Sequence, residues 1–244
     1  MSAVTDLMRS HVSVRSFSDE PIAPDTLVGI LQAGQAASTS SHVQAYSVVR
    51  VLDPSKRLAI SEAAGGQKWV VNAPEFLVYC ADLRRLNYAC TKAGQGALEG
   101  LTEHSVAAAV DVALFAQNVL LAAESEGLGG VFIGGIRNAP QIVIDQLGLP
   151  EFVFPLFGMC LGYPQERNAI KPRLPLEAVL HTDSYDLAKI EPLIDSYDET
   201  MAAYYAERGS AAATNWSSSV AGALQLKRRE HMHSLLQQQG FFRA

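Results

Sequence analysis

The chain has 244 residues, of which 48% are hydrophobic and 18% are charged. This balance is ordinary for a globular protein and far from that of a disordered chain. The formal net charge is −6, which excludes a broad basic surface for nucleic acid or anionic lipid. An anionic ligand therefore needs a local cluster of Arg or Lys.

Targeting and redox signals predict a cytoplasmic protein. The first 17 residues have no apolar core of signal-peptide length, and we expect no later run to approach membrane-spanning length. The three cysteines, Cys80, Cys90 and Cys160, form no C-x-x-C pair. Cys80 and Cys160 lie within apolar runs, which is typical of small core residues in a reducing compartment.

The pattern of apolar residues predicts intermixed helices and strands. In chain order, we expect helices from Pro24 to the hydroxyl run at Ser38, over 55–64, over 105–126 and over 138–147. Strands are expected over 46–52, 76–81, 130–133 and 152–161. The helix over 105–126 is apolar on nearly all sides, which indicates burial. No regular strand–helix–strand repeat fits, so the sequence favours an α+β layer fold.

The character of the chain changes after residue 170. Pro172, Pro175 and Pro192 punctuate an extended segment, and helical stretches follow near 190–208 and 217–239. We therefore predict a core over residues 1–170 and a C-terminal arm over residues 171–244, with less core of its own.

Two clusters of cations could hold an anion. His11, Ser13 and Arg15 alternate along the chain, which places them on one side of an extended segment. Arg binds phosphate through two N–H groups at once. In Lys171-Pro172-Arg173, the proline restricts the backbone between two cations. Each cluster is also consistent with a solvated basic surface.

Two further segments offer hydroxyl or backbone groups. The run Ser38-Thr39-Ser40-Ser41 could line a ligand, or it could satisfy the carbonyls at a helix end. The paired glycines within residues 129–135 leave backbone N–H groups open to a flat ring, or form a tight corner that needs no ligand. Their spacing does not fit G-x-G-x-x-G, so a Rossmann site is disfavoured.

Several other chemistries lack their motifs. The six histidines include no H-E-x-x-H, and His231 and His233 lie two apart on a predicted helix, so no metal site is expected. Neither G-x-S-x-G nor a P-loop is present, which removes the usual support for a hydrolase or an NTPase. The run Lys227-Arg228-Arg229 could suggest nucleic-acid binding, but it is typical of a solvated helix face.

Taken in order, these segments resemble the oxygen-insensitive NADPH nitroreductase and flavin reductase P family. The resemblance runs from about residue 6 to about residue 208 and is carried by residues 11–17, 38–44, 65–67, 132–138, 155–158 and 171–175. It implies a nitroreductase-like, FMN-binding α+β fold with a central, mostly antiparallel sheet flanked by helices. It also implies a homodimer in which C-terminal arms embrace the partner subunit.

The resemblance further implies which residues bind FMN. They are His11, Ser13, Arg15, Ser38, Thr39, Ser40, Ser41, Gln67, Ile133, Gly134, Gly135, Lys171 and Arg173. The three cations, with His11 and Ser13, would hold the phosphate and ribityl chain. The hydroxyl run and Gln67 would line the ring, which the backbone of residues 133–135 would face.

The implied reaction takes place on FMN, with no side chain as nucleophile. Hydride would pass from NADPH or NADH to N5 of FMN, and then, in ping-pong order, to a small electron acceptor such as a nitroaromatic or a quinone. A flavin reductase that supplies reduced free FMN would use the same site. A low-turnover, FMN-binding sensor is a further alternative.

Three residues are assigned to the nicotinamide or the acceptor. Arg208 matches the family arginine that approaches the 2′-phosphate of NADPH, but residues 211–213 are alanines where relatives often have further basic residues. The preference for NADPH over NADH therefore stays open. His42 follows the serine run and is either a pocket residue or a surface residue. Glu99 stands where the family has an acidic residue near the site entrance.

Overall fold

The computed structural model describes residues 2–166, 168–209, 215–225 and 229–243. The chain divides into two compact units: the first comprises residues 1–168 and 230–244, and the second comprises residues 169–229. The sequence analysis placed one boundary, between residues 170 and 171. The structure groups the last residues of the chain with the first unit, whereas the prediction placed them in the arm.

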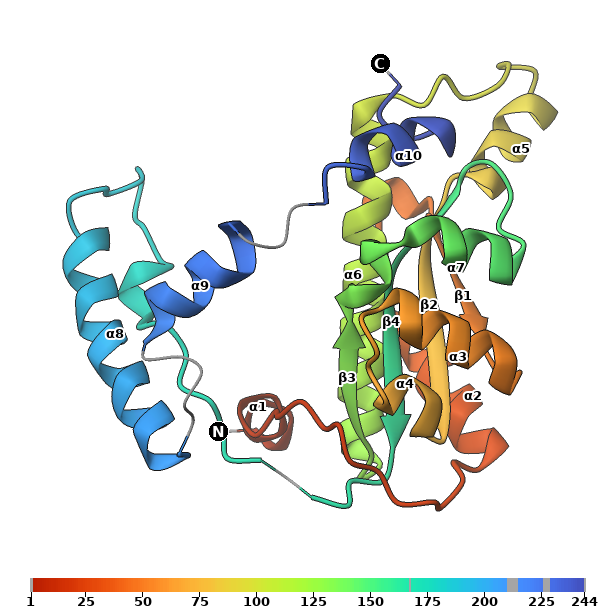
Figure 1. Ribbon diagram of the computed structural model, residues 1–244. Helices are drawn as coiled ribbons and strands as arrows, with labels where there is room; N and C mark the ends of the chain where they lie inside the picture. The colour runs from red at the N-terminus through yellow and green to blue at the C-terminus, as the bar shows by residue number, and fades with distance from the viewer. Residues whose placement is uncertain (1, 167, 210–214, 226–228, 244) are drawn as a thin grey trace. The chain divides into compact units, whose positions relative to one another are not determined.

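A four-stranded sheet forms the centre of the first unit (Figure 1). Its strands are β1 (Tyr46–Arg50), β2 (Glu75–Asp82), β3 (Gly129–Ile133) and β4 (Val153–Gly162). Their order across the sheet is β1-β2-β4-β3, and every neighbouring pair is antiparallel. The predicted α+β fold with a mostly antiparallel sheet is confirmed, with β1 and β3 at its two edges.

Strand β2 explains why both faces of the sheet are covered. All eight of its residues are buried. Leu77, Tyr79 and Ala81 belong to the hydrophobic cluster on one face, while Phe76, Val78 and Cys80 belong to the cluster on the other. Side chains of a strand alternate between faces, so a continuous apolar run requires helices on both sides.

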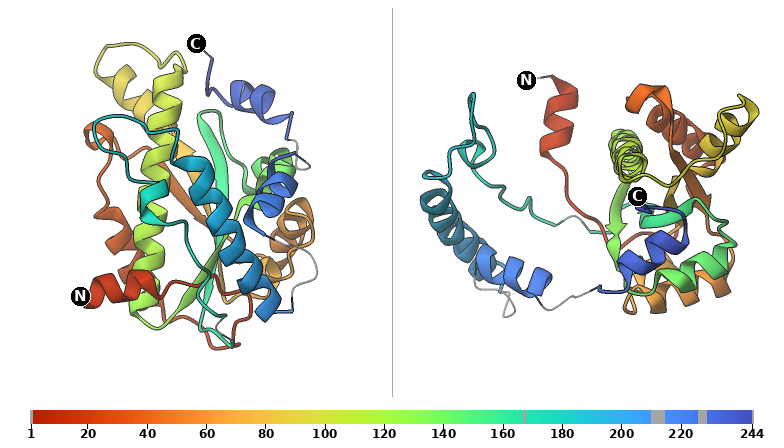
Figure 2. Two further views of the ribbon diagram at one scale, coloured as in Figure 1. Left: turned by 90° about the vertical axis from the view of Figure 1, so that its left-hand side faces the viewer. Right: turned by 90° about the horizontal axis from the view of Figure 1, so that it is seen from above.

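The helices form one layer on each face of the sheet (Figure 2). Helices α2 (Pro24–Gln35) and α6 (Thr102–Ser125) cover one face, and α3 (Pro54–Ala63), α4 (Trp69–Asn72) and α7 (Pro140–Leu147) cover the other. Helix α2 approaches α6 closely at Gly34, where a Cβ atom would lie 2.7 Å from the Phe115 ring. Gly34 therefore fixes the packing of this layer.

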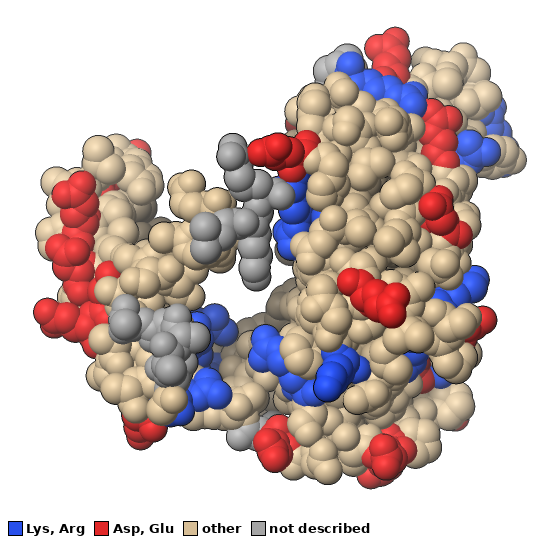
Figure 3. Space-filling model, viewed as in Figure 1, with Lys and Arg blue, Asp and Glu red and all other residues tan. Residues whose placement is uncertain are grey.

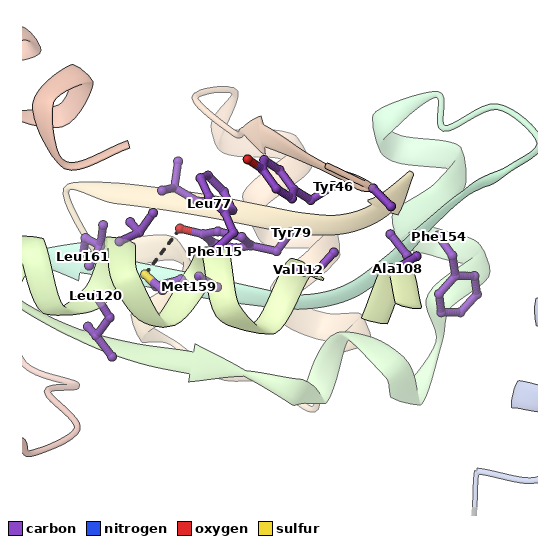
Figure 4. Packing of buried hydrophobic residues seen from close by; sticks show 14 of the residues in the cluster. Tyr46, Leu77, Tyr79, Ala108, Val112, Phe115, Leu120, Phe154, Met159 and Leu161 are labelled. Carbon is purple, nitrogen blue, oxygen red and sulfur yellow. Dashed lines mark hydrogen bonds between the residues drawn. The ribbon is translucent and has the colours of Figure 1, made fainter. Parts of the chain in front are cut away.

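The core between α6 and the sheet is aromatic and aliphatic (Figure 4). Phe115 of α6 stacks on Tyr46 of β1 with ring centroids 4.4 Å apart, and Tyr79 of β2 lies next to both Phe115 and Met159. Offset and tilted ring pairs of this kind stabilise a core beyond the area that they bury.

Helix α6 corrects one expectation from the sequence. With 24 residues and a mean hydropathy of 1.8, it is long and apolar enough to cross a membrane, although no run of that length was expected. Its buried side chains pack against the sheet and α2, however, as in the core helix of a soluble protein. The length and apolar composition of α6 are therefore explained by core packing.

Three helices of the first unit, α1, α4 and α5, were not predicted. Helix α1 (Ala3–Arg9) begins at Ser2, whose hydroxyl accepts from the backbone N–H of Thr5. Helix α5 (Arg84–Lys92) begins after Asp82, whose carboxylate accepts from the N–H groups of Arg84 and Arg85. Neither α1 nor α5 has a fully buried residue, although α5 is amphipathic and packs Leu86 against the core.

The C-terminal residues complete the core of the first unit. The predicted helical stretch over 217–239 is two helices, α9 (Trp216–Gln225) in the second unit and α10 (Met232–Gln238) in the first. After α10, Phe241 is only 1% exposed and lies edge-on to Phe154, and the backbone N–H of Arg243 donates to Gly100 at 2.8 Å. The end of the chain is therefore fixed against α6 and β4.

The second unit has its own small core. Helix α8 (Ile190–Glu207) buries Tyr197, Met201 and Tyr204, which pack with Trp216 of α9. The exposed residues Glu191, Asp195 and Glu199 follow one another at four-residue intervals along α8. Acidic side chains gather over this helix in Figure 3. The exposed acidic face of α8 is distinct from its buried aromatic face.

Candidate active site

The segment over residues 11–15 lies beside the edge strand β3. Val14 is 2% exposed, and its backbone N–H donates to the carbonyl of Gly130 at 3.0 Å. A Cβ atom at Gly129 would lie 2.6 Å from the Val14 side chain, so this approach requires glycine. With Val14 turned into the core, the neighbouring Arg15 is exposed.

His11 is joined to α6 through a carboxylate. Its Nδ1 lies 2.5 Å from Oε1 of Glu124, whose side chain is largely buried. If Nδ1–H donates to Glu124, then Nε2 can donate to an anion only when the ring is protonated. The structure thus adds a negative partner to the predicted phosphate ligand.

Three of the predicted FMN ligands form one connected group with Trp69, which we call the β3-edge group. The Arg15 guanidinium lies over the Trp69 ring, 5.7 Å from its centroid. Trp69 Nε1 donates to Oε1 of Gln67 at 3.1 Å, and Gln67 Nε2 donates to Ala64 at 2.9 Å. A Cβ atom at Gly135 would collide with Gln67 and would lie 2.5 Å from the Ala64 carbonyl. The group therefore comprises Arg15, Gln67, Trp69 and Gly135.

The sequence analysis missed Trp69, although a signal was present. An aromatic residue two positions after Gly65-Gly66-Gln67 is well placed to contact whatever Gln67 contacts. The glycine corner that completes the group begins where β3 ends at the buried Ile133, and it continues as a 3₁₀ turn over Gly134–Asn138. Gly134 and Gly135 are both half-buried, as expected for a backbone that faces a ligand.

The segment over residues 38–45, which we call the serine loop, has a strained backbone. Ser41, His42 and Gln44 have φ values of 46°, 58° and 55°, in the left-handed region that favours glycine. Each such residue costs about 1 kcal/mol or more. Strain of this kind persists only where surrounding contacts fix it.

Asp111 of α6 holds both ends of the strained segment. Its carboxylate is 0% exposed and accepts from the backbone N–H of Ser40 at 2.9 Å and of Ala45 at 3.0 Å. Hydrogen bonds to a buried charge are about twice as strong as those between neutral groups. The sequence analysis did not single out Asp111, although it is the only acidic residue between Glu103 and Glu124.

A single chain does not bring the serine loop and the β3-edge group together. The serine loop precedes β1 and is bonded to α6, whereas Gln67 and Gly135 contact the end of α3, on the other face of the sheet. Because β1 and β3 are opposite edges, three strand spacings, or about 14 Å, also separate them. Within one chain, therefore, Gln67 does not share a site with the hydroxyl run Ser38, Thr39, Ser40 and Ser41.

The remaining predicted residues of the first unit are on its surface. His42 is exposed within the serine loop, and its Nε2 lies 3.3 Å from the side-chain amide of Gln44. Glu99 is exposed in the segment between α5 and α6, next to Leu98. The Leu98 N–H donates to the Asn87 side chain at 2.7 Å, which fixes this segment on α5.

The second unit brings Lys171 and Arg208 to adjacent tyrosines. Lys171 Nζ lies 5.2 Å from the centroid of the Tyr205 ring, and its hydrogen bond lowers the pKa of the Tyr205 phenol. Arg208 donates to Tyr204 Oη at 2.9 Å and lies over the Tyr204 ring. Burial raises the pKa of Tyr197, and Lys171 and Arg173 oppose that shift. Residues 211–213, which are alanines where relatives often have basic residues, lie outside the residues that the structure describes.

The chain belongs to the nitroreductase family. Residues 8–163 match the nitroreductase family, and residues 171–243 match the C-terminal domain of that family. Together these two matches cover most of the chain, with a gap close to the boundary between its two compact units.

Several named relatives are similar over their whole length. An NADPH-flavin oxidoreductase of Vibrio harveyi is 44% identical over 98% of both chains, and an oxygen-insensitive NADPH nitroreductase of Salmonella typhimurium is 41% identical over 99% of both. Nitroreductase A of Vibrio parahaemolyticus has the same fold, with a TM-score of 0.91, 41% identity and 100% coverage of both chains. The predicted family resemblance is confirmed.

Proposed function

We propose that this protein is an FMN-dependent NAD(P)H oxidoreductase that reduces nitroaromatic or quinone-like acceptors. The β3-edge group carries this proposal, because it joins a cation, an indole, a carboxamide and a glycine corner along one exposed edge. The names of the relatives support it, since they include an NADPH nitroreductase and an NADPH-flavin oxidoreductase.

The donors of the β3-edge group match the chemistry of FMN. Arg15 is exposed and suits a phosphate, whereas Gln67 has a carboxamide that suits the polar edge of a flavin ring. We assign the same phosphate to His11 and Ser13. The family resemblance also assigns Lys171 and Arg173 to the phosphate, and that assignment stays a prediction. When bound, FMN supplies a ring that takes a hydride from nicotinamide and passes it to an acceptor, so the two substrates alternate.

Backbone groups of this chain adjust how readily the flavin ring that they face is reduced. We assign the backbone of Ile133, Gly134 and Gly135 to the ring, because the absence of Cβ atoms at the two glycines permits close approach. Amide donors directed at the ring favour its electron-rich, reduced form. Trp69 packs against Arg15 and excludes water from one side of this group.

A homodimer completes the site in this proposal. Val106, Val110 and Leu114 are 47%, 51% and 44% exposed and follow at four-residue intervals on α6. Exposed apolar stripes of this kind mark protein interfaces. A second copy on this stripe would supply the serine loop that one chain cannot bring to its own β3-edge group. Replacing Val110 with Glu should therefore yield a monomer with little bound FMN, as measured by light scattering and visible absorbance.

Reduction of free FMN is the second candidate activity. The relatives of this chain include an FMN reductase of Bacillus subtilis, which is 40% identical over 99% of this chain. The two activities share the flavin and differ in the acceptor. The cytoplasm is the proposed location, since all three cysteines are free thiols.

The test is a visible spectrum followed by two half-reactions. The purified protein should be yellow, should bleach on anaerobic addition of NADPH or NADH, and should recover its colour on addition of nitrofurazone. Faster oxidation of NADPH with free FMN than with nitrofurazone as the acceptor would assign flavin reduction as the main activity. A colourless protein that takes up no FMN would refute the proposal.

A further inference from the structure

A cavity of about 460 Å³ lies in the first unit beside the serine loop. Its walls come from the serine loop, from α5 and from the first two turns of α6. Most of the lining is apolar, including Val43, Leu83, Leu86 and Leu98. This volume is in the range of small-molecule sites. The β3-edge group does not line the cavity, whereas Ser40 and Ser41, which were predicted to line the flavin ring, do.

The polar groups of the cavity indicate the charge of its ligand. Ser40 and Ser41 line the cavity and offer hydroxyl groups that can donate or accept a hydrogen bond. Nδ1 of His104 is closed to solvent, so a ligand in the cavity does not reach it. Glu103 also lines the cavity, and no Lys or Arg is among its described lining residues. The cavity therefore favours a neutral ligand with a hydrogen-bonding group and disfavours an anion.

One wall of the cavity is held rigid. Ser40 and Ser41 belong to the serine loop, and both ends of its strained segment are bonded to the buried carboxylate of Asp111. Tyr46, the residue after Ala45, is fixed by its stack on Phe115. A wall that is already ordered loses little entropy when a ligand binds.

We propose that this cavity binds the ring of a neutral aromatic electron acceptor with a hydrogen-bonding substituent, and discriminates against anionic acceptors. The apolar walls bury the ring, the hydroxyl of Ser40 or Ser41 bonds to the substituent, and Glu103 repels negative charge. The role as an acceptor site rests on the proposed function, in which the serine loop adjoins the flavin of a partner subunit. The binding itself needs neither flavin nor nicotinamide.

Cys90 is a natural reporter of this cavity. It lines the cavity and is half-buried, whereas Cys80 and Cys160 are 0% exposed. Burial raises the pKa of the Cys80 thiol to about 12 and also raises that of Cys160, so neither forms a reactive thiolate near pH 8. Iodoacetamide should therefore alkylate Cys90 alone in the native protein, as peptide mass spectrometry would show.

The test compares two ligands of nearly equal shape, 4-nitrobenzamide and 4-nitrobenzoate, without nicotinamide so that no turnover occurs. Saturating 4-nitrobenzamide should slow alkylation of Cys90 at least about tenfold, and 4-nitrobenzoate should need at least about tenfold more ligand for the same effect. The Glu103→Gln variant should reduce this ratio between the concentrations of the two ligands that protect Cys90 equally. Absence of protection by 4-nitrobenzamide, or a ratio that Glu103→Gln leaves unchanged, would overturn the proposal.

A variant that fills the cavity gives a second readout. Ala107→Leu, on the α6 wall, should remove the protection of Cys90 and raise KM for 4-nitrobenzamide more than KM for NADPH. Ala33→Leu, on the exposed face of α2, is the matched control and should change neither. Protection of Cys90 in Ala107→Leu equal to that in the parent would contradict the proposal. A protein that shows protection but no turnover would contradict the proposed function alone.

Discussion

Asp111 offers the most direct test of how the serine loop is held. Its carboxylate makes two hydrogen bonds from full burial, to Ser40 and Ala45. Hydrogen bonds to a charged group contribute about 1.5–3 kcal/mol each, so Asp111→Ala loses about 3–6 kcal/mol. Relaxation of the left-handed residues returns about 1–3 kcal/mol of that loss. The net expectation is a decrease of about 3 kcal/mol in the free energy of unfolding.

Asp111→Asn should have a smaller effect of about 2 kcal/mol, because its one carboxamide oxygen can still accept from one of the two N–H groups. Urea denaturation of the FMN-free protein, followed by circular dichroism, measures both changes. In the FMN-bound enzyme, Asp111→Asn should also raise KM for the acceptor, since the serine loop would move.

Glu75→Gln is the matched control for this experiment. Glu75 is a buried carboxylate on β2 that is paired with Arg50, away from the serine loop. It should destabilise the protein without a selective rise in KM for the acceptor. An Asp111→Asn protein as stable as the parent would refute the reasoning, and so would an equal rise in acceptor KM in both variants.

Three further predictions follow from single contacts. Arg208→Ala should raise KM for NADPH much more than KM for NADH, as measured by steady-state kinetics, and equal increases would exclude a role at the 2′-phosphate. Gly135→Ala places a Cβ atom against Gln67 and 2.5 Å from a backbone carbonyl, so the protein should be purified with much less FMN than the parent; a full complement of FMN would contradict this. Because the pKa of Cys80 is raised to about 12 in the folded state, its contribution to stability is complete below about pH 8.5 and is lost as pH rises toward 12. The free energy of unfolding should fall by about 1.4 kcal/mol per pH unit for this thiol above about pH 9, and Cys80→Ala should reduce that slope.

The sequence predicted the elements that bury apolar residues. Helix α6, strand β2 and strand β4 all carry long apolar runs, and each was expected within a few residues of its observed bounds. Helix α1 was missed because it buries no residue, and α4 because it is a single turn. Helix α5 is amphipathic, with Leu86 packed on the core, so a signal for it was present. Periodicity reports burial, so a helix that is held by caps and by its neighbours gives little signal.

The site was predicted in its parts more than in its arrangement. Gln67 and Gly135 were expected to act together, and the structure places them in contact. However, the order of residues along a chain does not reveal which strands become the edges of a sheet. That order separates the serine loop from the β3-edge group. Asp111 was missed because its role depends on partners that are distant in sequence, whereas Trp69, two residues from its partner Gln67, could have been found. The structure leaves the predicted FMN roles of these residues as proposals.

The return of the chain to the first unit has a consequence for biosynthesis. Phe241 packs against Phe154, and Arg243 bonds to Gly100, so residues that follow the second unit along the chain close a core whose other parts were made much earlier. Domains fold as they emerge, with the N-terminal parts first. Here the first unit can finish folding only after the whole second unit has been translated. A chain cut after the second unit would have an open core, which proteases would recognise, so a stable first unit depends on residues translated after the second.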